Sequence, residues 1–485
     1  MAIRGILLRT LALGAVLLVG CGERRSGPIA VSAIGAAPAL LNPNRQPPDA
    51  PAAFLLSATA QGLVRLDATG QVEPALAQSW TVSDDGLRYT FRIARGTWPD
   101  GAQITADQVV PRLRAAMART SRNRLKPVLG AIAGIERMTE SVLEITLKSP
   151  RPHFLQLLAQ PDMAIIRANA GTGPYRADMD DGVLTLEDAR PEVEDEEPGN
   201  RLIEIALRGE TAALAVARFA EGEADLVTGG TAGDLPLARA ANPAAAALRF
   251  DPVNGLFGLT IADNRGAMRD PAVRRALNMA IDRAAIVAAL RVPDLLPRES
   301  LVPAGIPEMP VPALPDWSAS PLPMRRSLAA EAIAGAAGGE ARLTVRVAVP
   351  EGPGYRLIFA LLRRDWNAIG VDAQAAAPGT RADLRLIDVT APTSIAAWYL
   401  RHFTCAAGAI CNSEADTALE AARNVPTAAE RQAQLAAADR LLTDAAIFMP
   451  IAAPVRWSLV SQRLTGFQPN PFGTRFPGSL VARRR

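Results

Sequence analysis

The sequence predicts an α/β protein of two or three lobes, and three observations support this fold class. The chain has 485 residues, which is more than one ordinary hydrophobic core accommodates. Strand patterns of period two are interleaved with helix patterns of period 3.6. Between residues 202 and 227 an alternating strand, a helix and a short apolar strand follow one another, and this β-α-β order implies a parallel sheet.

The composition is that of a globular protein without a nucleic-acid partner. Hydrophobic residues make up 49% and charged residues 21% of the chain. The net charge is +3, and Arg4 and Arg9 contribute two of these charges from the extreme N-terminus. The chain contains no basic block and no basic stretch interleaved with aromatic residues, so we expect no binding to nucleic acid.

The N-terminus predicts export and lipid anchoring. Residues 1–20 have two arginines and then the apolar run TLALGAVLLVG, which suits a signal peptide and is too short for a permanent membrane helix. The run ends in LVGC, which resembles a bacterial lipobox with Cys21 as the lipidated residue, and 21–28 would be the tether. The alternative is an ordinary signal peptide followed by a chance cysteine. No later segment reaches 18 apolar residues, so we expect a lipid anchor alone.

The first part of the chain predicts a strand at 29–34, then hairpins and one helix. Apolar and polar residues alternate on both sides of the turn Ser83-Asp-Asp-Gly86, so residues 77–98 predict a hairpin. Thr105-Ala-Asp-Gln108 has the spacing of a capping box, and Pro111 is placed to kink the helix that follows.

From residue 172 onward, predicted strands and helices alternate. Asp270 before Pro271 is typical of a helix start, and Thr427 with Glu430 has capping-box spacing. The acidic run 192–197 predicts a solvated loop, and 293–323 an extended proline-rich connection. We expect further strands at 181–187, 202–207, 226–227, 343–349, around 372 and at 383–389. We expect helices up to about 223 and at 270–281, 282–290, 327–334, 356–369 and 427–444.

Two cysteines, Cys405 and Cys411, remain after Cys21. In an oxidising compartment a small local disulfide is the expected state. Free thiols are one alternative. A metal site is another, although His402 is the one further ligand nearby.

The sequence lacks the motifs of the common enzyme classes. His153 and His402 are the only histidines, and neither lies in an H-E-x-x-H pattern. Lys126 and Lys148 both follow leucine, so no phosphate-binding G-x-x-x-x-G-K loop is possible, and any ATPase must be another chain. The glycine cluster 229–233 predicts a loop. We therefore expect no enzyme activity, no cofactor and no bound metal.

Six stretches, in order along the chain, together resemble the family 5 extracellular solute-binding proteins, the peptide- and nickel-type receptors of ABC importers. The first contains LAQSW, DGLRYTF and DGAQITADQV, with Gln108 where the family has a second Asp. The others are GTGPYRAD, RFAEGEADLV, the stretch with RRALNMAIDR, the segment 352–371 ending in IGV, and CNSEADTALEAAR.

This resemblance implies a three-lobed clamshell of the type II periplasmic-binding-protein class with a discontinuous first lobe. Lobe I would comprise 29–57, 172–251 and 440–485, lobe II 58–171, and lobe III 252–439. The implied function is that of a monomeric, extracytoplasmic receptor. It would close on a peptide or other small solute and pass it to separate permease and ATPase subunits. The alternatives are a nickel-chelate-type receptor and a lipoprotein with a sensory or protein-holding role.

The resemblance also suggests an acidic ligand-binding residue. Peptide-binding relatives carry G-W-x-x-D-x-x-x-P, whose Asp pairs with a peptide ammonium. Here Asp388 and Pro392 keep the spacing, but Leu384 and Arg385 replace the Gly-Trp pair. Arg385 could therefore neutralise the carboxylate. The alternative is that Asp388 is a solvated residue at a strand end.

By the same comparison, segments 350–356 and 398–402 would face the cleft. Their candidate ligand-binding residues are Tyr355, Arg356, Trp398, Tyr399 and Arg401. Trp398 or Tyr399 would give a flat apolar wall with a polar edge, and Arg356 or Arg401 would pair with a carboxylate in a fork. The alternative is that Trp398 and Tyr399 are core residues and that both arginines are solvated.

Overall fold

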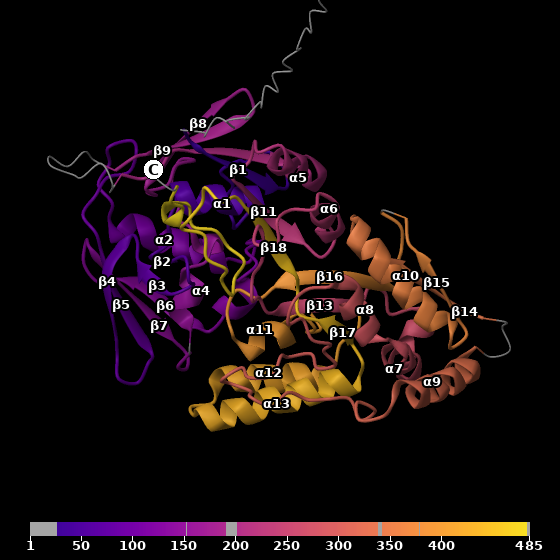
Figure 1. The fold of residues 1–485 in the computed structure, drawn as a ribbon. Helices are drawn as coiled ribbons and strands as arrows, with labels where there is room; N and C mark the ends of the chain where they lie inside the picture. Colours follow the sequence, from indigo (N-terminus) through magenta and orange to yellow (C-terminus); the bar gives the residue numbers. More distant parts are fainter. Residues whose placement is uncertain (1–26, 152, 191–200, 338–341, 378, 483–485) are drawn as a thin grey trace, which may run out of the picture.

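The computed structural model describes residues 27–151, 153–190, 201–337, 342–377 and 379–482. Three principal sheets organise these residues into three lobes, and Figure 1 shows the lobes packed around one another. The predicted signal peptide, the lipidation site Cys21 and the acidic run 192–197 lie outside the described residues. None of the described helices combines the length and apolarity needed to cross a membrane.

Lobe I is built on a seven-stranded sheet in the order β12-β18-β11-β1-β10-β9-β8. The central strand β1 (Ile29–Ile34) is parallel to both β10 (Ile205–Glu210) and β11 (Leu226–Thr231), which confirms the predicted β-α-β arrangement. The other strands are β8 (Tyr175–Asp180), β9 (Val183–Asp188), β12 (Leu248–Phe250) and β18 (Arg456–Val460). Its helices are α1 (Ala50–Thr59), α5 (Ala212–Ala220) and α6 (Leu235–Ala240).

Lobe II is built on a four-stranded antiparallel sheet in the order β4-β5-β7-β6. The predicted hairpin forms its first two strands, β4 (Ala77–Val82) and β5 (Arg88–Ile93), and β6 (Ile132–Arg137) and β7 (Val142–Leu147) complete it. The remaining elements are β2 (Val64–Leu66), β3 (Val72–Pro74), α2 (Ala106–Met117), α3 (Lys126–Leu129) and α4 (Phe154–Leu158).

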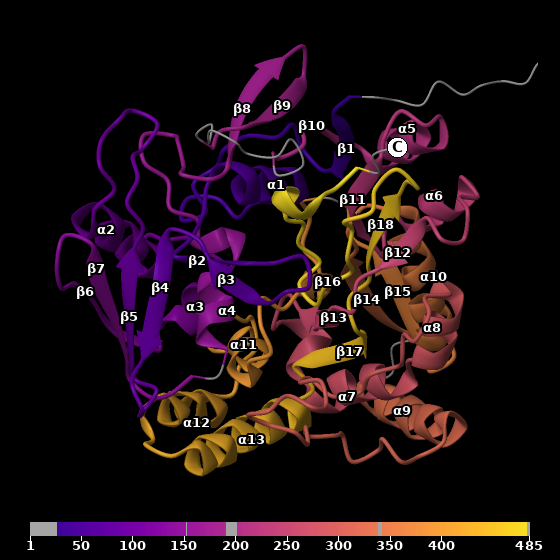
Figure 2. The same cartoon turned by 60° about the vertical axis from the view of Figure 1, so that its left-hand side comes forward.

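Lobe III is built on a five-stranded sheet in the order β15-β14-β16-β13-β17. Its strands are β13 (Gly255–Ile261), β14 (Leu343–Ala348), β15 (Val371–Ala375), β16 (Leu384–Thr390) and β17 (Phe448–Ala452). Its helices are α7 (Pro271–Ala280), α8 (Arg283–Leu290), α9 (Leu322–Ala336), α10 (Pro353–Asn367), α11 (Ala396–Arg401), α12 (Ser413–Asn424) and α13 (Ala428–Asp444). Figure 2 shows α12 and α13 passing beneath both lobe II and lobe III.

The strand β17 corrects the expected lobe boundary. We placed residues 440–485 in lobe I, but β17 pairs with β13 in the sheet of lobe III. It is an edge strand of that sheet, and all five of its residues are buried, so both of its faces are covered. The chain returns to lobe I only at β18, and the crossing between the lobes lies near residues 453–455.

Local capping signals were reliable at most helix starts but failed at one. Asp270 accepts the amide of Ala272 to cap α7, and Thr427 forms the predicted capping box with Glu430. In contrast, the Thr105 side chain makes no capping bond to α2. The side chain of Gln108, the expected partner, instead accepts a hydrogen bond from the indole of Trp98 at 2.5 Å.

Two of the buried clusters hold the lobes together. One runs from the sheet of lobe II into α11, α12 and α13 of lobe III. The other joins the sheets of lobes I and III and includes Phe257, Trp366 and Trp457. Because burial of apolar area favours these contacts, the lobes form one packed body in this conformation.

The carboxyl group of Asp439 in α13 predicts a specific pH dependence of stability. The residue is 0% exposed, and Oδ2 accepts the amide of Ala313 at 2.6 Å. Burial raises the pKa of Asp439 to about 6, whereas an unfolded aspartate titrates near pH 4. Its contribution to stability is therefore complete below about pH 4 and is lost as the pH rises through about 6.

We expect Asp439→Asn to remove that loss. Urea unfolding at about pH 4.5 and about pH 7.5 should show the wild type losing a few kcal/mol relative to the variant over this range. Asp444→Asn, at an exposed position in the same helix, is the matched control and should follow the wild type. Identical pH dependence of wild type and Asp439→Asn would contradict the assignment.

Candidate ligand-binding site

Asp388 lies where lobe III meets lobe I. It is near the end of β16, and four segments converge on this point: β16 itself, the start of α10, the turn between β11 and α6, and the start of β18 (Figure 2). The two lobes meet close to the strands that cross between them. The site is therefore placed where relative movement of the lobes changes its contacts.

The Asp388 carboxylate is buried and fully engaged by groups of the chain itself. Its side chain is 4% exposed, and Oδ1 accepts a hydrogen bond from Nη1 of Arg456 at 2.7 Å. The Tyr355 hydroxyl donates to Oδ2, also at 2.7 Å. A second guanidinium nitrogen of Arg456 reaches the carbonyl oxygen of Asp388 at 3.1 Å. A cation from lobe I and a phenol from α10 thus satisfy this anion.

Tyr355 and Asp234 also lie at this contact between lobes I and III, which we call the seam. Their pKa values are raised because little solvent reaches them. Burial, and then the charge of Asp388, raise the pKa of the Tyr355 hydroxyl, so it remains a donor at physiological pH. Burial raises the pKa of Asp234 at the start of α6, and the charge of Asp388 adds to that effect. Thr231 donates its hydroxyl to Asp234 at 2.9 Å. The seam therefore holds Asp234 as a second acidic group, opposite in charge to the Arg456 guanidinium.

Glycines allow the two lobes to approach closely at this seam. A Cβ on Gly233 would clash with the ring of Tyr355, and a Cβ on Gly354 would clash with the carbonyl oxygen of Ala232. The amide of Gly354 donates to the carbonyl oxygen of Gly233 at 2.8 Å. Larger residues at these positions would separate α10 from the β11–α6 turn.

The structure brings two of the sequence-predicted residues, Tyr355 and Asp388, into direct contact. Arg385 is exposed on the opposite face of β16, so the neutralising cation is Arg456 and not Arg385. Arg356 is exposed, and its side chain makes no hydrogen bond or ion pair with the described residues. The Arg401 guanidinium donates to the carbonyl oxygen of Leu419 at 2.8 Å, within lobe III.

The aromatic pair of α11 is packed into the core rather than forming an open wall. Trp398 is 3% exposed and its ring meets those of Tyr399 and His402 edge to face. Tyr399 is 0% exposed, but its hydroxyl has no hydrogen-bond partner among the described residues. Packing thus accounts for Trp398, whereas the hydroxyl of Tyr399 makes no hydrogen bond to the described residues.

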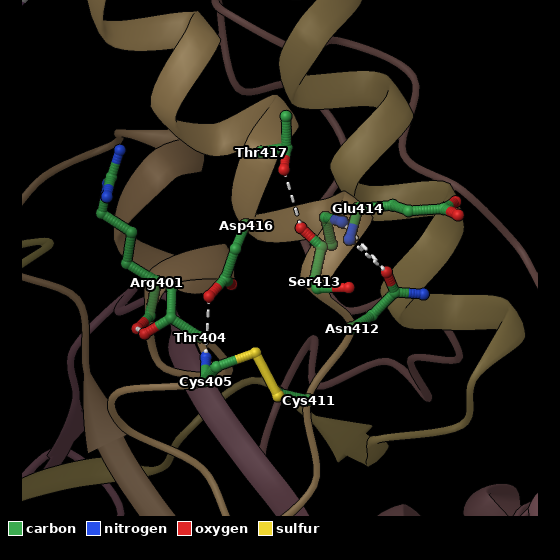
Figure 3. The surroundings of a disulfide bond; sticks show 10 residues. Arg401, Thr404, Cys405, Cys411, Asn412, Ser413, Glu414, Asp416 and Thr417 are labelled. Carbon is green, nitrogen blue, oxygen red and sulfur yellow. Dashed lines mark hydrogen bonds between the residues drawn. A yellow bond between two sulfur atoms is a disulfide. The ribbon is translucent and has the colours of Figure 1, made fainter.

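A disulfide joins Cys405 and Cys411 in the loop between α11 and α12, with a Cα–Cα distance of 4.8 Å. Figure 3 shows the amide of Cys405 donating to the carboxylate of Asp416, and Asn412 capping α12 directly after the bridge. The Arg401 side chain extends away from the disulfide in the same view. The bridge therefore fixes the loop that leads into α12. Among the described residues, no group of three or more His, Cys, Asp or Glu side chains is placed to hold a metal ion.

A separate cavity of about 240 Å³ lies between lobes I and II. It is lined by α1, the β2–β3 hairpin, the segment around Gln160 and the C-terminal residues 476–479. None of the sequence-predicted ligand residues lines it. Its volume is below the roughly 300–1,000 Å³ usual for small-molecule sites.

The residues that sequence reasoning missed are those without a local signal. Arg456 has none, because its partner lies 68 residues earlier in the chain. Gly233 belongs to the cluster 229–233, which we interpreted only as a loop. That cluster was the available signal, since consecutive glycines often mark a close backbone approach.

Comparison with protein families shows the family to which the chain belongs. Residues 71–401 match the family model "Bacterial extracellular solute-binding proteins, family 5 Middle". The chain belongs to this family.

Its sequence is 29% identical over 270 residues to the nickel-binding periplasmic protein of Escherichia coli K12. The aligned region covers 51% of this chain and 50% of that protein. It is 35% identical over 130 residues to the glutathione-binding protein GsiB of Salmonella choleraesuis, covering 24% of this chain and 25% of the relative. The chain thus spans half or less of the length of these curated relatives.

Solved structures of similar proteins confirm the type II periplasmic-binding-protein fold of this family 5 member. The structure matches Haemophilus influenzae OppA in complex with the peptide RPPGFSPFR with a TM-score of 0.82, at 16% identity over 95% of this chain and 100% of OppA. It matches the E. coli murein tripeptide binding protein MppA with a TM-score of 0.81, at 18% identity over 95% of this chain and 99% of MppA. The unliganded open form of MppA gives 0.66, with 94% of this chain and 98% of MppA covered.

We expect Arg456→Ala to destabilise the protein strongly, because it leaves the Asp388 carboxylate buried without its cation. The loss in unfolding free energy should be about 3–5 kcal/mol, measured by urea denaturation with tryptophan fluorescence. The control is Arg356→Ala, an exposed arginine next to Tyr355, which should change it by less than about 0.5 kcal/mol. Asp388→Ala combined with Arg456→Ala should cost less than the sum of the single changes. Strict additivity would contradict a direct pair.

Proposed function

We propose that this family 5 protein is the extracytoplasmic substrate-binding component of an ABC importer. It captures a peptide or other small solute between lobes I and III and delivers it to a separate permease, whose ATPase subunits are further chains. The observation that carries this proposal is the seam at Asp388, where groups from both lobes meet in a buried polar cluster. A solute that contacts both lobes there binds the closed form better and shifts the equilibrium toward it.

The proposal assigns the protein no catalytic step. The polar groups of the seam pair with one another, and among the described residues no group of three or more His, Cys, Asp or Glu side chains is placed to hold a metal ion. A receptor needs only a ligand that binds one of two conformations more tightly than the other. The chain segments that cross between lobes I and III would allow the movement between these conformations.

A nickel-chelate receptor is the second candidate, favoured by the similarity to the nickel-binding periplasmic protein over 51% of this chain. Such a chelate would bring most of its own metal ligands. A sensory or protein-holding lipoprotein is the remaining alternative, and retained affinity for a small solute distinguishes transport from it.

We expect the purified protein to carry a small molecule. Native mass spectrometry of protein isolated from the periplasm without refolding should show a bound species of low mass. Removing it and adding it back should raise the thermal midpoint, because a ligand that binds only the folded state stabilises it. A metal-containing mass would favour the nickel-chelate reading. Ligand-free protein together with no thermal response to short peptides would contradict the transport role.

The lipid anchor is a separate proposal that rests on the LVGC stretch ending at Cys21. We expect Cys21→Ala to move the protein from the membrane fraction to the soluble fraction and to abolish labelling by radioactive palmitate. Cys405→Ala, in the mature part of the chain, is the control and should leave labelling unchanged. A wild-type protein that stays with membranes and takes up no label would contradict lipidation.

A further inference from the structure

A small cavity of about 30 Å³ lies where lobe II packs against α11, α12 and α13 of lobe III. It shares no lining residue with the seam at Asp388. Most of its lining is apolar, and every polar residue that lines it is ionisable. These residues are Arg151 of lobe II and Glu308, Arg401, Arg423 and Arg431 of lobe III. Four cations and one anion therefore surround this cavity.

The carboxylates near the cavity are already engaged by two of the four arginines. The Glu308 side chain is 5% exposed, its Oε1 accepts a hydrogen bond from Arg431, and its Oε2 accepts the amide of Ala396 at 3.2 Å. Arg423 pairs with Glu420, its neighbour in α12, at 2.9 Å. The other two arginines must therefore find their counter-charge elsewhere.

Arg151 and Arg401 form no ion pair with any residue in the described part of the chain. The Arg151 guanidinium makes one long hydrogen bond, to the carbonyl oxygen of Pro150 at 3.5 Å. The Arg401 guanidinium makes one hydrogen bond, to the carbonyl oxygen of Leu419 at 2.8 Å. Because a guanidinium carries five N–H donors, most of the hydrogen-bonding capacity of both groups is unused.

The surroundings disfavour the charges of these two arginines. Burial, and then the charge of Arg431, lower the pKa of Arg151 to about 10. Burial, and then the charge of Arg423, lower the pKa of Arg401 to about 10. Both groups still carry their charge at physiological pH. Cations that are held together away from water are costly unless an anion balances them.

Hydrogen bonds place the four guanidinium groups around one space between the lobes. Arg151 and Arg431 donate to the same carbonyl oxygen, that of Pro150. Arg401 donates to α12 one turn before Arg423. In Figure 2, α11 and α12 lie below α3 and α4 of lobe II, and α11 contacts α3. Cations from both lobes thus meet at the contact between lobe II and lobe III.

We propose that this cavity binds a small inorganic anion, of the class of chloride and phosphate, which bridges Arg151 of lobe II and Arg401 of lobe III. A cavity needs roughly 10–15 Å³ to hold one water, so this one has room for a small ion and none for a peptide. Guanidinium groups bind such anions through charge-assisted hydrogen bonds. The anion is distinct from the transported solute, and its effect is to stabilise the contact between lobes II and III.

Thermal unfolding in three sodium salts of equal ionic strength tests this site. Gluconate is too large for the cavity and sets the baseline. We expect chloride or phosphate to raise the wild-type midpoint by about 2 °C above that baseline, with a concentration dependence that saturates. Arg151→Met should need an anion concentration about tenfold higher for the same rise. Arg356→Met, at an exposed arginine outside the cavity, is the matched control and should follow the wild type.

The order of stabilities in gluconate separates anion binding from a merely structural role of Arg151. Without an anion, Arg151→Met should unfold at the same or a higher temperature than the wild type, because the substitution removes one of four cations that repel one another. A lower midpoint of Arg151→Met in gluconate would contradict the proposal. So would a saturable rise in Arg151→Met at the same anion concentrations as in the wild type, or no rise of the wild type in either salt.

A crystallographic measurement on the wild-type protein needs no variant. Crystals grown in sodium bromide should show an anomalous peak within hydrogen-bonding distance of the Arg151 and Arg401 guanidinium groups. Bromide peaks elsewhere on the protein and none in this cavity would overturn the assignment. The native mass spectrum decides the transport role separately, since this anion site stands whether or not a solute copurifies.

Discussion

The ion pair between Arg456 of lobe I and Asp388 of lobe III is the interaction on which the rest of the site depends. In this pair, a cation from lobe I balances the buried negative charge at the end of β16 in lobe III. An unpaired carboxylate in that position would favour hydration and separation of the lobes. With the charge balanced, Tyr355 can pack against Gly233, and the backbones of α10 and the β11–α6 turn come into hydrogen-bonding contact.

This arrangement also changes what a ligand meets. The sequence resemblance implies that the aspartate at this position pairs with a peptide ammonium in peptide-binding relatives. Here Arg456 and Tyr355 engage the corresponding carboxylate. Leu384 and Arg385 also stand where those relatives carry a Gly-Trp pair. Under the proposed function, a solute between the lobes would therefore meet a carboxylate that groups of the chain already pair.

Much of the fold could be predicted because its signals are local. The turn at Ser83–Gly86, the cap at Asp270 and the capping box at Thr427 are each contained in a few residues and are confirmed. Local sequence signals failed where residues distant in the chain offer a competing contact. Gln108 is engaged by Trp98 instead of Thr105, and the short apolar strand β17 carries no information about which sheet it joins. The site was predicted only in part for the same reason, since Arg456 approaches Asp388 through tertiary packing.

The central claim is that the Arg456–Asp388 pair stabilises the contact between lobes I and III, and an inter-lobe distance tests it most directly. Spin labels at Glu221→Cys in lobe I and Glu331→Cys in lobe III occupy exposed positions, and double electron–electron resonance measures the distance between them. The account predicts a narrow distribution for the otherwise unchanged protein. Adding Asp388→Ala should shift the distribution to longer distances, and adding Arg356→Ala should not. An unchanged distribution in the Asp388→Ala protein, with the fold intact, would contradict the claim.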